Sequence, residues 1–318
     1  MLNHRLLSSK SAHTGQLHCY PHVIEFKRAF LTDRYICIVM EYANGGDLSN
    51  YVQRAGGRLK EAAARWFFQQ LILGIDYCHR KGVVNRDIKL ENTLLQVLPN
   101  VNHPPLIKIC DFGYSKAQGL SAPKSKVGTL AYMAPEVITS SKYNGNLSDV
   151  WSCAVMLYTM LCGQNPFEAP LDTGGLNALA SIVGGQQLRA NEIKALRILN
   201  ALWRFPDEQL TGIILSTECR DLLSRVMVAD PARRLSISDI QNHPWFIINL
   251  PQSALLMNEA YLSAVDYSGM QSEAEIHAMM EAVLSDKCDA PKHRHADSVT
   301  EGNSYMDDMI DATIAEET

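Results

Sequence analysis

The sequence predicts an α+β fold with a small region of two short strands, a larger and mainly helical region, and a C-terminal extension. Residues 23–30 and 35–39 are apolar segments with a polar link between them, which predicts two strands joined by a tight turn. Apolar side chains recur at helical spacing within residues 59–80, which predicts one long helix. Residues 148–162 are apolar nearly all round, which is typical of a helix in the middle of a large core.

Shorter elements are expected elsewhere: a helix from about Asp47, short strands at 94–95 and 106–110, a surface insertion rich in small residues at 174–185, and an amphipathic helix at 218–228. In the C-terminal extension, Ser272 and Glu275 form a capping box ahead of an apolar stripe, so a helix is expected over residues 272–285. Residues 301–318 are acidic and contain no Lys or Arg, which predicts a solvated tail.

Composition argues against several classes of protein. The 318 residues are 47% apolar and carry a formal net charge of −5, which argues against general binding of nucleic acid and against a polybasic membrane anchor. No apolar run approaches about 20 residues, so no membrane span is expected, and the N-terminus has no secretory signal. The eight cysteines are scattered without a C-x-x-C pair, which favours reduced thiols over disulfides and a cytoplasmic or nuclear location.

Three short motifs occur in a fixed order: NRDIKLEN at residues 85–92, DFG at 111–113 and APE at 134–136. Each could arise by chance when taken alone, and DFG in particular is weak evidence. The ordered set at this spacing is very specific for phosphoryl transfer, in which a protein must position a hydroxyl, a γ-phosphate and Mg²⁺ and offset the phosphate charge.

The chemistry assigns a role to each polar group in the motifs. Asp87 is expected to orient the substrate hydroxyl and accept its proton, and Lys89 is expected to contact the γ-phosphate. Asn92 and Asp111 are expected to hold two Mg²⁺ ions through hard oxygen ligands.

Residues 21–246 resemble the eukaryotic protein kinases, and within them the plant sucrose-nonfermenting-related kinases of subfamily 2, the osmotic-stress and abscisic-acid-activated group. The finer resemblance is carried by KLENTLL at 89–95, KICDFGYSK at 108–116, PKSKVGT at 123–129, DVWSC at 149–153 and LLSRVMVADPARR at 222–234. It implies a kinase-like α+β fold, phosphorylation of protein Ser or Thr with ATP and Mg²⁺, and a regulatory role for the helix at 272–285.

The resemblance also implies a nucleotide site. Met40 would be the gatekeeper, and Glu41, Tyr42 and Ala43 would form the hinge that binds adenine through backbone groups, while Asp47 would reach the ribose. For Met40 and Tyr42 a simple role in the core is an equal alternative.

Further positions take regulatory or structural roles by resemblance. Arg86 would bind a phosphate group on the activation loop, which is the segment between DFG and APE. Glu136 would pair with Arg234 in a buried ion pair. Asp149 would hold the backbone of the catalytic loop, the motif at residues 85–92.

Substrates and partners follow from the same residues. Carboxylates at Asp47 and Glu91 suit a protein substrate with a basic residue upstream of the acceptor, and Lys89 favours Ser or Thr over Tyr as that acceptor. The acidic tail is expected to offer a site for a protein phosphatase or another basic partner, with a merely solvated tail as the alternative.

The chain departs from the family pattern in several places. Position 85 is Asn where the family has His, position 126 is Lys in place of a hydroxyl residue, and position 130 is Leu in place of Pro. No glycine-rich loop and no V-A-I-K-like strand precede the hinge, and Asn3-His4-Arg5 resembles the sequence just after the family's αC glutamate. We therefore expect an incomplete reading frame or a natural truncated form.

The expected organisation is an atypical segment at 1–22, a kinase domain at 23–246 and a regulatory extension at 249–318. Within the kinase domain, residues 23–40 would form a partial small lobe and residues 44–246 the large lobe. Two other functions stay open. A catalytically impaired or truncated kinase-like scaffold would bind partners through the large lobe and the tail, and the missing glycine-rich loop and phosphate-aligning Lys favour it. An unrelated ATP-binding enzyme would need a phosphate motif such as Walker A, which the sequence lacks.

Ser125 is predicted to be the activating phosphosite, because it lies between DFG and APE at a position that is phosphorylated in the resembling family. Thr129 is expected instead to supply a structural hydroxyl near Asp87 and Lys89. Phosphopeptide mapping of active protein should find phosphate on Ser125, and active protein with Ser125 unmodified would contradict the assignment.

Overall fold

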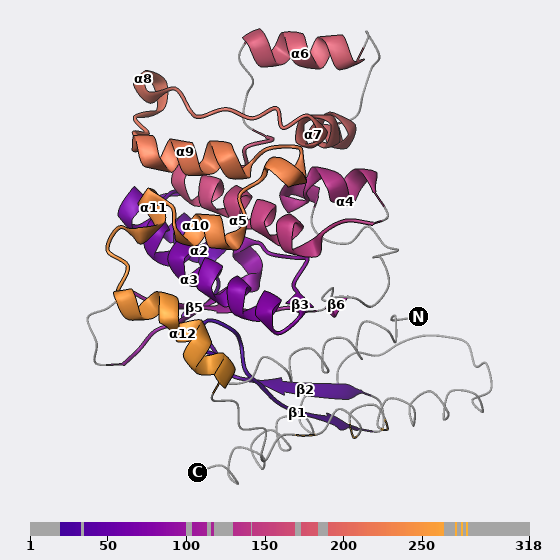
Figure 1. Cartoon of the computed structure of the whole chain (residues 1–318), viewed down its shortest axis with the longest axis vertical. Helices are drawn as coiled ribbons and strands as arrows, with labels where there is room; N and C mark the ends of the chain where they lie inside the picture. The colour runs from indigo at the N-terminus through magenta and orange to yellow at the C-terminus, as the bar shows by residue number, and fades with distance from the viewer. Residues whose placement is uncertain are drawn as a thin grey trace, which may run out of the picture. The chain divides into compact units, whose positions relative to one another are not determined.

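Three antiparallel strand pairs and a larger set of helices make up the part of the chain described by the computed structural model (Figure 1). That part comprises residues 20–32, 35–99, 104–112, 116–117, 130–140, 142–168, 173–183, 190–263, 271, 275 and 278. The paired strands are β1 (Phe26–Leu31) with β2 (Ile36–Met40), β3 (Val83–Val84) with β6 (Lys116–Ala117), and β4 (Thr93–Gln96) with β5 (Leu106–Ile109). The predicted α+β class is confirmed.

The helices account for most of the regular structure. They are α2 (Leu48–Arg54), α3 (Glu61–Arg80), α4 (Pro135–Thr139), α5 (Gly145–Cys162), α6 (Thr173–Val183), α7 (Ala190–Leu199), α8 (Glu208–Thr211), α9 (Thr217–Val226), α10 (Ile237–Gln241), α11 (Pro244–Ile247) and α12 (Gln252–Ser263). Short 3₁₀ turns lie at Leu90–Asn92, Leu130–Tyr132 and Pro231–Arg233. The segment expected as a surface insertion thus contains a helix, α6.

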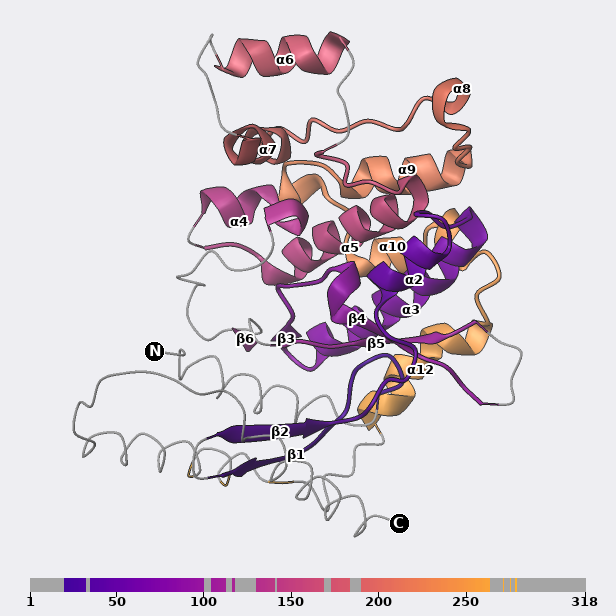
Figure 2. The ribbon, with the colours of Figure 1, turned by 180° about the vertical axis from the view of Figure 1, so that it is seen from behind.

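Helix α5 lies inside the core, and α3 and α9 pack against it (Figure 2). Trp151 and Tyr158 are among its fully buried side chains, as the apolar run from 148 to 162 predicts. The helix begins three residues earlier than expected, at Gly145. The reason is a cap: the Asn144 side chain accepts hydrogen bonds from the amides of Asn146 (3.0 Å) and Leu147 (3.3 Å).

The first strand begins at Phe26, so its predicted start at Val23 is wrong. Residues 22–24 pair with the end of β5 instead of β2. Ile109 donates to the carbonyl of His22 at 2.8 Å, and Ile24 donates to the carbonyl of Ile109 at 2.9 Å. Local sequence gives no sign of this pairing because β5 is far away along the chain.

The chain crosses between β2 and α2 close to β4. The Gly45 amide donates to the carbonyl of Leu95 at 2.7 Å, and a Cβ at Gly45 would lie 2.6 Å from that same oxygen. Only glycine allows this approach without a shift of the backbone. The contact fixes the start of α2, whose N-terminus is capped by Asp47.

Helix α12, in the C-terminal extension, packs on α3. The Asn258 amide is 1% exposed and donates to the Leu73 carbonyl (3.0 Å) and to the Asp76 carboxylate (2.7 Å). The hydroxyl of Tyr20 donates to the side chain of Asn258, and the Tyr20 ring stacks on Tyr77 with centroids 4.2 Å apart. The start of the extension is therefore tied to the helical region by buried polar contacts.

Most of the predicted helix at 272–285 lies outside the described residues, although Glu275 and Ala278 are helical and exposed. Just before it, the side-chain amide of Gln271 accepts from the amide of Ala29 (2.8 Å) and donates to its carbonyl (3.0 Å). This pair of bonds joins the extension to strand β1, as a neighbouring strand would.

None of the six cysteines within the described residues forms a disulfide. Cys78, Cys153, Cys162 and Cys219 are buried, and burial raises the pKa of each thiol above its ordinary value. In the same part of the chain, no helix has the length and apolar character needed to cross a membrane.

We predict that His22 makes the fold less stable as the pH falls. Burial lowers the pKa of its imidazole from 6.5 to about 4, so between these values the unfolded chain binds a proton that the folded chain does not. The stabilisation is fully present above pH 6.5 and is lost as the pH falls towards 4. Denaturant unfolding at pH 7 and pH 5 should differ by about 2 kcal/mol from this group. The variant His22→Asn should reduce the difference by that amount, and an unchanged difference would contradict the assignment.

Candidate active site

A buried carboxylate on helix α5, Asp149, holds the chain where it turns from β3 towards β4. Its Oδ2 accepts from the Asn85 amide at 3.0 Å and its Oδ1 from the Arg86 amide at 2.9 Å. The His79 ring, at the end of α3, contacts Oδ2 at 2.8 Å. Asp149 is 1% exposed, so these three partners offset the loss of water around its charge.

The catalytic-loop residues converge on Asp87, which is 5% exposed. Its Oδ2 accepts from Lys89 Nζ at 2.8 Å and from Asn92 Nδ2 at 2.8 Å. Burial by itself would lower the pKa of Lys89, but the hydrogen bond and charge of Asp87 outweigh it and raise that pKa. Lys89 is therefore cationic, and the arrangement is a fixed carboxylate flanked by a cation and an amide.

Asp111 lies beside this cluster in an uncommon backbone conformation, with φ at 55°. The preceding residue anchors it, because the Cys110 amide donates to the carbonyl of Asn92 at 3.0 Å. Asp111 is close enough to contribute to the raised pKa of Lys89. The structure thus brings Asp87, Lys89, Asn92 and Asp111 to one place.

The hinge residues lie between β2 and α2. The carboxylate of Glu41 is bound by Lys108 of β5 at 2.7 Å and by the Glu25 amide at 3.2 Å. Ala43 is buried, whereas Met40 is 46% exposed and Tyr42 is 83% exposed. The alternative of a core role for Met40 and Tyr42 is therefore wrong, because both side chains remain open to solvent.

Asp47 has a clear structural role that the sequence did not indicate. Its Oδ1 accepts from the Asn50 amide at 2.7 Å, which caps the N-terminus of α2. Glu91, the other carboxylate assigned to substrate, is exposed.

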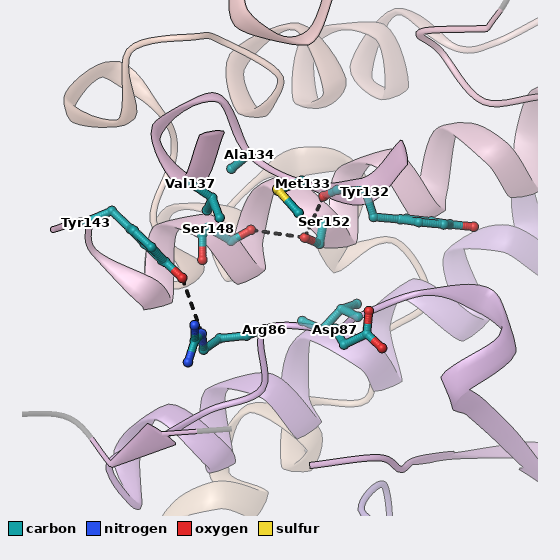
Figure 3. Close-up of a pocket in the computed structure, with 10 residues that line it drawn as sticks. Arg86, Asp87, Tyr132, Met133, Ala134, Val137, Tyr143, Ser148 and Ser152 are labelled. Carbon is teal, nitrogen blue, oxygen red and sulfur yellow. Dashed lines mark hydrogen bonds between the residues drawn. The ribbon is translucent and has the colours of Figure 1, made fainter. Parts of the chain in front are cut away.

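A pocket lies beside the catalytic loop, between residues 86–88, the 132–137 segment and the first turns of α5 (Figure 3). The Arg86 Nε donates to the hydroxyl of Tyr143 at 3.2 Å across one side of it. On the other side, Ser152 Oγ donates to the carbonyl of Tyr132 at 2.8 Å. Arg86 and Asp87 both line this pocket, so it adjoins the Asp87 cluster.

Glu136 and Arg234 form a bidentate ion pair, with N···O distances of 2.6 and 2.9 Å. The Arg234 side chain is fully buried, and it also donates to the carbonyl of Leu147 at 2.8 Å. Its guanidinium lies over the ring of Trp151. The pair joins α4 to the segment before α10 and to the N-terminal turn of α5.

Ser125 and Thr129 lie outside the described residues, as does Lys126. Conversely, three residues near the site were not found from the sequence: His79 on Asp149, Lys108 on Glu41 and Tyr143 on Arg86. No pattern in the sequence marks these contacts, because each joins two elements that are far apart along the chain. Only the placement of helix ends and strands in space could have shown them.

Comparison with known proteins identifies the family to which the chain belongs. Residues 11–246 match the protein kinase domain family. The match covers well over half of the chain, so the chain belongs to the protein kinase family. It ends at the residue where the resemblance was predicted to end and begins ten residues earlier.

Its relatives include plant kinases of one group. Serine/threonine-protein kinase SRK2I of Arabidopsis thaliana is 41% identical over 293 residues, which are 92% of this chain and 74% of that protein. SRK2E of the same plant is 44% identical over 83% of this chain and 66% of its own length. SRK2A of Physcomitrium patens is 47% identical over 73% of this chain and 60% of its own length. The predicted likeness to plant subfamily 2 kinases is confirmed, and by family the chain is a serine/threonine protein kinase.

The family uses ATP and Mg²⁺, and the residues present fit the metal. Asn92 and Asp111 supply an amide and a carboxylate oxygen, and Mg²⁺ commonly takes one or two such ligands and fills its remaining positions with phosphate oxygens and water. No cluster of three or more His, Cys, Asp or Glu side chains that could hold a metal occurs among the described residues.

We predict that breaking the Glu136–Arg234 pair strongly destabilises the fold. Arg234→Met or Glu136→Gln should each cost about 3–5 kcal/mol of unfolding free energy, because either leaves a buried polar partner uncompensated. The double variant should cost less than the sum of the two. As a control, Arg225→Met removes an exposed pair (3.5 Å to Asp221) and should change stability by less than about 1 kcal/mol. Additive losses, measured by denaturant unfolding, would show that the pair is not coupled.

Proposed function

We propose that this chain transfers the γ-phosphate of ATP to Ser or Thr of protein substrates. The observation that carries the proposal is the Asp87 cluster: a buried carboxylate with Lys89 and Asn92 both 2.8 Å from its Oδ2. The catalytic loop that bears it is fixed to the core through Asp149. A pre-set base and cation are what phosphoryl transfer requires from a protein.

Each residue then has a defined task. Asp87 accepts the hydrogen bond of the substrate hydroxyl and takes its proton as the oxygen attacks phosphorus. Lys89 offsets negative charge on the transferred group, and Asn92 holds Asp87 through Nδ2 while its Oδ1 is available as a metal ligand. Bound Mg²⁺ supplies charge neutralisation of the phosphates. The hinge at 41–43 would bind adenine, with Lys108 fixing the side chain of Glu41.

Substrate choice and regulation are also proposed. Exposed Glu91 suits a basic residue upstream of the acceptor, whereas Asp47 would have to serve substrate or ribose while capping α2. The likeness to plant subfamily 2 kinases supports a role in stress signalling. It also supports binding of a protein phosphatase to the acidic tail at 301–318. A cytoplasmic or nuclear location is proposed from the scattered cysteines alone.

A second candidate function is a kinase-like scaffold with impaired catalysis. The observation that favours it is Asn85, which stands where the family has His and whose side chain is fully buried in the catalytic loop. A scaffold would bind partners without turning over ATP.

We predict that Asp87→Asn abolishes phosphate transfer. Removing the base should lower the rate by at least about 10²-fold, because general base catalysis typically contributes that much or more. The measurement is transfer of radiolabelled phosphate from ATP with Mg²⁺ to a Ser peptide with an upstream Arg, compared with the same peptide bearing Glu there. The control Glu218→Gln makes the same carboxylate-to-amide change at an exposed position of α9 and should keep full activity. A folded chain with no transfer that depends on Asp87 would support the scaffold.

A further inference from the structure

The backbone amides of residues 85–87, at the start of the catalytic loop, all donate hydrogen bonds to side-chain oxygens. The amides of Asn85 and Arg86 donate to the two oxygens of Asp149, at 3.0 and 2.9 Å. The amide of Asp87 donates instead to Asn85 Oδ1, at 3.1 Å. The first two amides are therefore held from the core, whereas the third is held by a side chain of the turn itself.

The backbone of Arg86, which lies between Asn85 and Asp87, is strained. Arg86 has φ at 72°, in the left-handed region that residues other than glycine enter at a cost. A bond from the side-chain carbonyl of Asn to the amide two residues later closes an Asx turn, which stabilises a tight turn of this kind. Histidine, the family residue at position 85, could accept such a bond only through a ring nitrogen, as His243 does from the Trp245 amide at 3.2 Å.

Packing alone does not explain an asparagine at this position. Asn85 is fully buried, and its Nδ2 has no hydrogen-bond partner among the described residues. A buried donor without an acceptor is unfavourable, so an apolar side chain of the same size would pack better. The side-chain amide of Asn85 is instead explained by its Oδ1, which accepts a hydrogen bond from the backbone amide of Asp87.

We propose that Asn85 is a positioning residue whose Oδ1 sets the direction of the Asp87 carboxylate by holding the Asp87 amide. This inference rests on the proposed kinase function for its effect on rate. Its effect on the Asp87 backbone is independent of that function.

Two substitutions separate positioning from packing. Asn85→Leu has nearly the same size, removes the acceptor and also removes the unpaired donor. Asn85→Ser keeps an acceptor oxygen that can reach the amide two residues later but leaves a cavity. Positioning predicts that Leu lowers kcat while keeping or raising Tm, and that Ser lowers Tm while largely keeping kcat. If Asn85 serves packing alone, Asn85→Leu should keep the kcat of the parent and should be more stable than the parent.

The measurements are kcat, KM for ATP, Tm, and hydrogen exchange of the Asp87 amide by NMR, all on the full chain. For Asn85→Leu we expect kcat to fall about tenfold with KM for ATP unchanged, and exchange at Asp87 to quicken about tenfold, the factor that one hydrogen bond commonly contributes. For Asn85→Ser, kcat and exchange should stay within about twofold of the parent. Parent-like kcat and exchange in Asn85→Leu would overturn the proposal.

Two further arms keep the test decisive. If Asn85→Leu does not fold, Asn85→Ala and Asn85→Ser form a matched pair of similar volume that differ in the acceptor. Only Ala should lose protection at the Asp87 amide, and equal protection in the two would refute the positioning role. If the parent shows no transfer that depends on Asp87, the proposed function fails, and amide exchange alone decides whether Asn85 positions Asp87.

Discussion

The carboxylate of Asp149 is the constraint on which the site depends. A charge that is 1% exposed is tolerable only when hydrogen bonds replace its water, and here the partners are two catalytic-loop amides and His79. Asp149 belongs to the core helix α5, and His79 belongs to α3, which packs against α5. The contact between these two helices therefore holds the catalytic loop in place. The position of Asp87 therefore follows from the packing of the core, and a shift of α5 would move the base with it.

The same end of α5 also holds the segment that follows the activation loop. Arg234 donates to the Leu147 carbonyl at 2.8 Å, two residues before Asp149, while its other bonds go to Glu136 and to the Val228 carbonyl. One helical turn thus joins the catalytic loop, the start of α4 and the region before α10. Tyr143, just ahead of this turn, bonds Arg86 as well. Changes at the end of the activation segment can reach the catalytic loop through Arg234 and this turn of α5.

Several elements could be predicted from local sequence and several could not. The apolar period of α3 and the all-round apolar face of α5 identified both helices, and the ordered motifs identified the residues around Asp87. The two wrong limits have different causes. Asn144 caps α5 three residues earlier than the apolar run indicates, which is a local effect, whereas residues 22–24 pair with Ile109, which is far away along the chain. The contacts His79–Asp149, Lys108–Glu41 and Arg86–Tyr143 join positions 70, 67 and 57 residues apart, so no local pattern contains them.

Backbone strain shows how much of the site is arranged by folding. Within the described residues, two of the non-glycine positions with positive φ are Arg86 at 72° and Asp111 at 55°, and each adjoins the phosphoryl-transfer cluster. Such conformations persist only where neighbouring bonds enforce them. The enforcing bonds are present: Asp149 holds the Arg86 amide, and the Asn92 carbonyl holds the amide just before Asp111. The free energy of folding, and not that of substrate binding, therefore maintains these two turns. A substrate that reaches Asp87 meets a carboxylate already oriented, so its own binding free energy remains available for aligning the phosphate and the hydroxyl.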